Sequence, residues 1–131
     1  MDELGSLLGW ADALVNLLPL TPATERLVDA ELLSSLPDGA LYVNAGRGPT
    51  TDTSALLEEL RRGRLRAVLD VVEPEPLPPE HPLWEAPGVL ISPHVAGDTA
   101  ESDRAAWRLV GEQLARFAGG EPLLNVVSEG Y

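Results

Sequence analysis

The sequence predicts an α/β protein in which about four parallel strands are joined by crossover helices and followed by a long C-terminal helix. Short aliphatic and β-branched runs, typical of buried strands, alternate along the chain with segments whose leucines recur at helical spacing. Polar or conformationally restricted residues stand directly after these runs, namely Pro19, Arg47, Asp70 and His94. Because ligands bind at the carboxyl ends of strands in parallel sheets, we expect these residues to face one crevice.

The N-terminal part of the chain reads as a helix followed by a strand. Residues 2–10 have the spacing of an amphipathic helix, and Asp2 is its expected N-cap. The side chains expected to face inward are Leu4, Leu7 and Leu8. The first strand covers residues 13–18, and a proline-containing segment ends it at residues 19–22.

Two further helices and strands alternate in the middle of the chain. Asp29 caps the first of these helices, and Asp52 or Thr53 caps the second. The leucines expected to face the core are Leu32, Leu33 and Leu36 in the first helix and Leu56, Leu57 and Leu60 in the second. The second strand covers residues 40–44, and the third covers residues 65–71.

The C-terminal part begins with a proline-rich segment. Residues 73–87 contain six prolines and read as an ordered, extended loop. The fourth strand follows at residues 89–92, and a long helix spans about residues 99–117. One stripe of this helix is apolar and consists of Trp107, Val110, Leu114 and Phe117.

Composition excludes several classes of function. The chain has 131 residues and a net charge of −12, so neither a basic nucleic-acid surface nor attraction to an anionic membrane is expected. It has no cysteine and only two histidines, so we expect no metal site. His81, inside the proline-rich segment, reads as a loop residue. No apolar run is long enough to span a membrane, and the acidic N-terminus does not resemble a signal peptide, so a cytoplasmic protein is expected.

Two of the strand-end residues are candidates for substrate chemistry. Arg47 lies between two glycines, whose small size would let a ligand approach closely, and it could hold a carboxylate through its planar fork. A surface arginine in a glycine turn would look the same. His94 could donate a proton near neutral pH, although a lone histidine is more often structural. A carboxylate that orients the imidazole would complete the site. The spacing leaves three candidates open: Asp70, Glu73 and Glu75.

The chain resembles the D-isomer-specific 2-hydroxyacid dehydrogenase family over nearly its whole length. The matching motifs, in order, are LPLTPAT, LYVNAGRG, AVLDVVEPEPLPPEHPLW and VLISPHVAGDTAES. The resemblance implies hydride transfer between NAD(P)H and a 2-keto acid, or the reverse oxidation of a D-2-hydroxy acid. In these terms Arg47 binds the substrate carboxylate and carbonyl, His94 donates the proton, and Glu75 pairs with His94. The related formate dehydrogenases carry Gln at the position of Glu75, so that branch is not favoured.

The same resemblance implies which residues line the cofactor, which would be NAD or NADP. Asp70 matches the residue that contacts the nicotinamide carboxamide. The cofactor-lining set as a whole is Leu18, Pro19, Thr24, Ala45, Gly46, Arg47, Asp70, His94 and Gly97. We expect a small-molecule 2-keto or 2-hydroxy acid as the partner and a homodimer as the assembly.

The sequence departs from the family at its N-terminus. The GxGxxG fingerprint of a dinucleotide-binding fold does not occur in it. We therefore expect a partial Rossmann-like fold, with residues 1–98 as the second half of the NAD-binding domain. Residues 99–131 would be an inter-domain helix and a return segment toward the substrate domain. An open strand edge and an uncovered sheet face should make the chain prone to self-association. The alternative function is a non-catalytic truncated fragment or a nucleotide-sensing module of the same fold.

Overall fold

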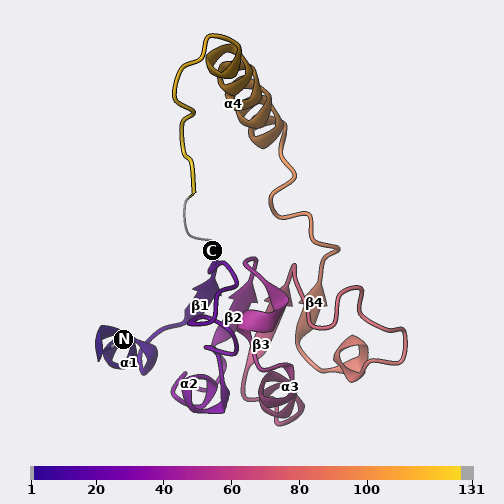
Figure 1. The fold of residues 1–131 in the computed structure, drawn as a ribbon. Coiled ribbons are helices and arrows are strands. Elements are labelled where there is room, and N and C mark those ends of the chain that lie inside the picture. Colours follow the sequence, from indigo (N-terminus) through magenta and orange to yellow (C-terminus); the bar gives the residue numbers. More distant parts are fainter. Residues whose placement is uncertain (1, 128–131) are drawn as a thin grey trace. The chain divides into compact units, whose positions relative to one another are not determined.

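The computed structural model describes residues 2–127 and contains one parallel sheet (Figure 1). Its strands are β1 (Ala13–Asn16), β2 (Leu41–Asn44), β3 (Arg66–Leu69) and β4 (Val89–Ile91), hydrogen-bonded in sequence order. All three neighbouring pairs are parallel. The predicted fold class is therefore confirmed, and the carboxyl ends of all four strands lie at the same edge of the sheet.

All four strands are shorter than the sequence pattern predicts, although β2 lacks only its first predicted residue, Ala40. β1 ends at Asn16 although the apolar run continues through Leu18. The side-chain oxygen Oδ1 of Asn16 accepts a hydrogen bond from the backbone N–H of Leu18 at 3.0 Å, which turns the chain out of the sheet. β3 and β4 likewise end before residues 71 and 92, the predicted limits.

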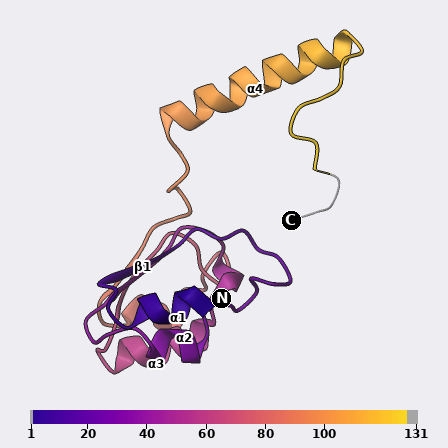
Figure 2. The same ribbon diagram turned by 90° about the vertical axis from the view of Figure 1, so that its left-hand side faces the viewer.

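Two helices cover one face of the sheet. α2 (Ala30–Ser34) and α3 (Thr53–Arg61) lie side by side below the strands in both ribbon views (Figure 1, Figure 2). Asp29 caps α2 as predicted, since its carboxylate accepts from the backbone N–H of Leu32 at 2.9 Å. Asp52 is the N-cap of α3, accepting from Ser54 and Ala55, which settles the choice between Asp52 and Thr53.

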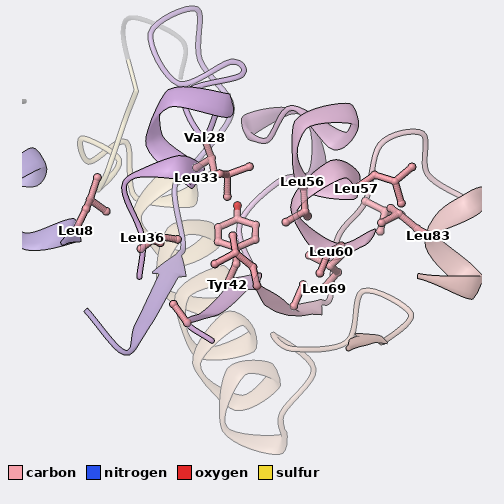
Figure 3. Close-up of a cluster of buried hydrophobic side chains, with 14 residues drawn as sticks. Leu8, Val28, Leu33, Leu36, Tyr42, Leu56, Leu57, Leu60, Leu69 and Leu83 are labelled. Atoms are coloured by element: carbon pink, nitrogen blue, oxygen red, sulfur yellow. The ribbon is translucent and has the colours of Figure 1, made fainter. Parts of the chain in front are cut away.

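The core lies between this helix pair and the sheet (Figure 3). The predicted inward leucines of both helices contribute to it, with Leu32 only partly buried. Its largest fully buried side chains include Tyr42 from β2, which lies among Leu33, Leu36, Leu56 and Leu60 in the close-up (Figure 3).

The N-terminal helix differs from its prediction. α1 covers Asp2–Leu8, two residues shorter than expected, and the side chain of its predicted cap, Asp2, lies outside the described part of the structure. Leu8 is buried and Leu4 packs against the core, but Leu7 is 47% exposed. Residues four apart lie closer to one line along a helix than residues three apart, so Leu4 and Leu8 point inward and Leu7 falls outside the contact.

The proline-rich segment contains one short helix. η2 (Pro82–Glu85) interrupts the predicted extended loop, and His81 caps it, since its Nδ1 accepts from the backbone N–H of Leu83 at 3.2 Å. A second short helix, η1 (Gly48–Thr50), follows β2. His81 is thus a loop residue with a local capping role.

The opposite sheet face carries an apolar row. The row consists of Val15, Val43, Val68 and Leu90, which are successive partners across the four strands. Val15 is 54% exposed and Leu90 is 58% exposed, while the two inner valines are partly buried. Within residues 2–94, α2 and α3 leave this row uncovered, as the sequence analysis expects.

The chain divides into two compact units, Met1–His94 and Val95–Tyr131, and the sequence-based boundary at residue 98 stays a prediction. The second unit contains α4 (Ala100–Ala118), a continuous helix capped by Thr99 (Figure 2). The side chain of Gln113 binds both the N–H and the carbonyl of Leu124, which ties the return segment to α4. The predicted apolar stripe is exposed along its whole length, and its members are Trp107, Val110, Leu114 and Phe117.

Candidate active site

The strand ends place the candidate residues in loops of the first unit. Arg47 follows β2, Asp70 and Glu75 follow β3, and His94 follows β4. These three strands are neighbours and parallel, so their following loops leave the same edge of the sheet. In the described part of the chain, no group of three or more His, Cys, Asp or Glu residues could hold a metal ion.

His94 and Glu75 form a direct pair. The ring nitrogen Nδ1 of His94 lies 2.7 Å from Oε1 of Glu75, a length typical of a charge-assisted hydrogen bond. Both side chains are roughly half exposed. The side chain of Glu73 makes no such contact, and its backbone carbonyl accepts from the hydroxyl of Thr53. Among the three candidate carboxylates, geometry therefore selects Glu75 as the partner of His94.

The backbone of His94 is strained. Its φ is +56°, in the left-handed region that residues other than glycine seldom adopt. Such a conformation costs on the order of 1–3 kcal/mol and is concentrated at functional sites. Its N–H donates to the carbonyl of Asp70 at 2.9 Å, which fixes the loop after β4 to the end of β3. In this conformation the imidazole lies against Glu75.

Asp70 is buried, and its carboxylate has a hydrogen-bond partner outside the pair. Its Oδ1 accepts a hydrogen bond from the hydroxyl of Ser92 at 2.7 Å. From the sequence, Ser92 was predicted only as the last residue of the fourth strand. A hydroxyl at the carboxyl end of a strand, one position before Pro93, is the signal that could have identified it.

Arg47 is exposed, and its guanidinium Nη1 donates to the carbonyl of Gly46 at 2.8 Å. Within residues 2–127, no hydrogen bond or ion pair joins it to Glu75 or His94. Among the described residues of the first unit, the Arg47 guanidinium forms no ion pair with a carboxylate.

The two glycines beside Arg47 serve loop packing. A Cβ on Gly46 would lie 2.6 Å from the carbonyl oxygen of Leu18, and a Cβ on Gly48 would lie 1.9 Å from that of Val72. The sequence analysis explains these glycines by close approach of a ligand. The structure gives another reason, because each glycine lets the arginine loop lie directly against a neighbouring strand-end loop.

Most of the expected cofactor-lining residues lie in the loops after β1 and β2, and Gly97 lies in the second unit. Leu18, Pro19, Ala45 and Gly46 lie in the two touching loops after β1 and β2, and Leu18 and Pro19 are exposed there. Thr24 supports the first of these loops, since its hydroxyl donates to the carbonyl of Pro19 at 2.6 Å. Gly97 belongs to the second unit and is therefore described apart from the other cofactor-lining residues.

A cavity of about 240 Å³ opens beside the acid–base pair. Its polar lining is Asp70, Glu75, Ser92 and His94, and its apolar wall includes Leu77 and Trp84. The indole N–H of Trp84 donates to the carbonyl of Pro78 at 2.8 Å, which holds the ring at the wall. Apolar walls with a few convergent polar groups are typical of pockets for small organic ligands. Trp84 is not among the site residues predicted from the sequence.

Comparison with known proteins gives a consistent result. Residues 1–96 match the profile of the D-isomer specific 2-hydroxyacid dehydrogenase NAD-binding domain. A D-isomer specific 2-hydroxyacid dehydrogenase from Xanthobacter autotrophicus Py2, solved with NADPH and MES, is 42% identical with a TM-score of 0.86. The match covers 98% of this chain and 52% of that one. An NADPH-dependent glyoxylate/hydroxypyruvate reductase from Sinorhizobium meliloti, solved with NADP and sulfate, is 41% identical with a TM-score of 0.84.

The similarity extends to 97% of this chain and 42% of the Sinorhizobium chain. An uncharacterised protein of Corynebacterium melassecola is 43% identical over 132 residues, which cover 97% of this chain and 42% of that protein. The chain thus spans about half the length of the relatives that it matches, or somewhat less.

Proposed function

The chain belongs to the D-isomer-specific 2-hydroxyacid dehydrogenase family, and from this premise we propose that it serves NAD(P)-dependent interconversion of a 2-keto acid and a D-2-hydroxy acid. The observation that carries the proposal is the pair between His94 Nδ1 and Glu75 Oε1 at the carboxyl edge of the sheet. Reduction of a ketone needs a proton donor beside the carbonyl oxygen, and a histidine held by a carboxylate is suited to that task.

Each polar residue of the site has a proposed role. His94 gives a proton to the keto oxygen during reduction and takes it back during oxidation. Its Nδ1 is engaged with Glu75, so Nε2 is the ring nitrogen that would face the substrate. Arg47 holds the substrate carboxylate and polarises the carbonyl, using the fork of its guanidinium.

The residues present fit a dinucleotide at the same edge. The touching loops after β1 and β2 expose Leu18 and Pro19, an apolar surface at the carboxyl ends of parallel strands, where such cofactors bind. Asp70, buried at the cavity and bonded to Ser92, would accept a hydrogen bond from the carboxamide of the cofactor. When bound, the nicotinamide would supply or accept the hydride. The profile match and the relatives solved with NADPH and NADP support NAD or NADP as the cofactor.

The non-catalytic alternative predicts a site that binds nucleotide without turnover. The presence of Arg47, Glu75 and His94 after three neighbouring strands favours an enzyme over the non-catalytic alternative. The test uses the product of the complete reading frame that encodes this chain, called here the full-frame protein. We expect NADH or NADPH oxidation, followed at 340 nm, with at least one small 2-keto acid of a panel that includes glyoxylate, hydroxypyruvate and pyruvate. Nucleotide binding without turnover on the whole panel would refute the proposed reaction.

A further inference from the structure

Two asparagines occupy equivalent positions beneath the site. Asn16 and Asn44 are direct partners across β1 and β2, each the last residue of its strand, and both are almost fully buried. Each uses its Oδ1 to hold the backbone N–H two residues further on, that of Leu18 in one case and that of Gly46 in the other, both at 3.0 Å. The same device therefore shapes the loop after β1 and the loop after β2.

The amide groups of these asparagines reach two adjacent threonines. Nδ2 of Asn16 donates to the hydroxyl of Thr50 at 2.8 Å, and Nδ2 of Asn44 donates to the hydroxyl of Thr51 at 3.1 Å. Both threonines are buried. The hydroxyl of Tyr42 joins the two halves, lying 3.1 Å from Nδ2 of Asn16 and 2.5 Å from the hydroxyl of Thr51.

Both halves of this network reach the arginine loop. The backbone carbonyl of Arg47 accepts from the hydroxyl of Thr50 at 2.6 Å and from Nδ2 of Asn44 at 3.1 Å. Thr50 thus donates to Arg47 while it accepts from Asn16, which holds Leu18. A continuous chain of hydrogen bonds runs from the N–H of Leu18 through Asn16 and Thr50 to the carbonyl of Arg47.

We propose that Asn16 and Thr50 are positioning residues that couple the loop after β1 to Arg47. A ligand that occupies the exposed surface at Leu18 and Pro19 then restricts the motion of the arginine loop before the keto acid binds. In a low-dielectric interior such chained hydrogen bonds reinforce one another, and a shift at one end is transmitted because the buried groups have no water to replace a lost partner. The functional consequence rests on the proposed function, whereas the mechanical coupling does not.

The coupling is tested in the chain as it stands, without any ligand. Thr50→Val and Thr51→Val remove one hydroxyl each from adjacent buried positions and are nearly equal in shape. Amide hydrogen exchange by NMR should accelerate roughly fivefold at Leu18 in Thr50→Val and at Gly46 in Thr51→Val, each leaving the other amide much less affected. Thr50→Ser, which keeps the hydroxyl, should restore the rate at Leu18. General loosening would instead accelerate both amides in both variants, and that result would overturn the proposal.

Kinetics of the full-frame protein test the consequence. Thr50→Val should raise KM for the keto acid and lower kcat, by roughly tenfold in kcat/KM, because Arg47 is displaced by less than about 1 Å. Thr50→Ser should recover most of the loss. Thr51→Val should have the smaller effect, since Thr51 does not touch the carbonyl of Arg47. Equal losses in the two valine variants would overturn the assignment to Thr50. If no keto acid is reduced, the proposed function fails while the exchange experiment still decides the coupling.

Discussion

Alanine at Gly48 would force two loops of the site apart. Its Cβ would lie 1.9 Å from the carbonyl oxygen of Val72 and 2.3 Å from the carbonyl carbon, and both atoms belong to backbone that cannot rotate away. Carbon–oxygen contacts are comfortable only from about 3.3 Å, so the loops must separate by more than about 1 Å. We expect a loss of about 3 kcal/mol in the free energy of unfolding, the upper part of the range for overpacking.

Two other glycines provide a graded comparison. A Cβ on Gly46 would approach the carbonyl oxygen of Leu18 to 2.6 Å, so Gly46→Ala should cost less, about 1–2 kcal/mol. Gly5, inside α1, has nothing within 4 Å of the added atom, and Gly5→Ala should stabilise the helix by up to about 1 kcal/mol. Chemical denaturation of the three variants measures the series. The reasoning is refuted if Gly48→Ala is no less stable than Gly46→Ala.

Further predictions concern the proton donor, alkaline stability and self-association. His94→Ala should lower kcat for keto-acid reduction roughly 10²–10⁴-fold in the full-frame protein, and a loss under tenfold would exclude His94 as the donor. Burial raises the pKa of the Tyr42 hydroxyl, against the hydrogen bonds with Thr51 and Asn16. The neutral phenol is thus favoured in the folded state, so the free energy of unfolding should fall as pH rises above about 10, and it should fall less steeply in Tyr42→Phe. Chemical denaturation at pH 9 to 11 measures this, and an equal loss of unfolding free energy in the two proteins would contradict it. Light scattering should show self-association of the chain, and Val15→Thr with Leu90→Thr should reduce it; a monodisperse monomer without these substitutions would contradict the role of the apolar row.

The sheet could be predicted from sequence because its signals are local. Apolar runs bounded by proline, glycine or a capping aspartate define four strands and the helices between them, and parallel order follows from their alternation. Strand ends were less predictable. The apolar pattern continues past Asn16 through Leu17 and Leu18, yet β1 stops because one side-chain oxygen captures the N–H of Leu18. A hydrogen bond from a single side chain overrides the hydrophobic pattern there.

The site could be predicted only in part. Spacing identifies Arg47 and His94 as strand-end residues but cannot distinguish Glu73 from Glu75, since both lie in one proline-rich loop. The choice depends on the path of that loop, which is set by tertiary contacts of Gly48 with Val72 and of Thr53 with Glu73. The left-handed backbone of His94 was also not predictable, because it depends on the tertiary path of the loop, where the N–H of His94 donates to the carbonyl of Asp70.

The loop, rather than the hydrogen bond to His94, must hold Glu75 in place. A pair as exposed as that of Glu75 and His94 contributes only about 0–1 kcal/mol, too little to order a segment of this length. Glu75→Gln should therefore change the free energy of unfolding by less than about 1 kcal/mol.

The same variant should nevertheless lower kcat at least roughly tenfold, because the amide no longer provides the carboxylate that orients and charge-balances the imidazole. Glu73→Gln is the matched control, since its side chain lies in the same loop without a contact to His94, and it should leave both quantities unchanged. Denaturation and steady-state kinetics of the two variants separate the roles. If Glu75→Gln loses stability and activity in proportion, the carboxylate is a structural element of the loop and its proposed part in proton transfer is wrong.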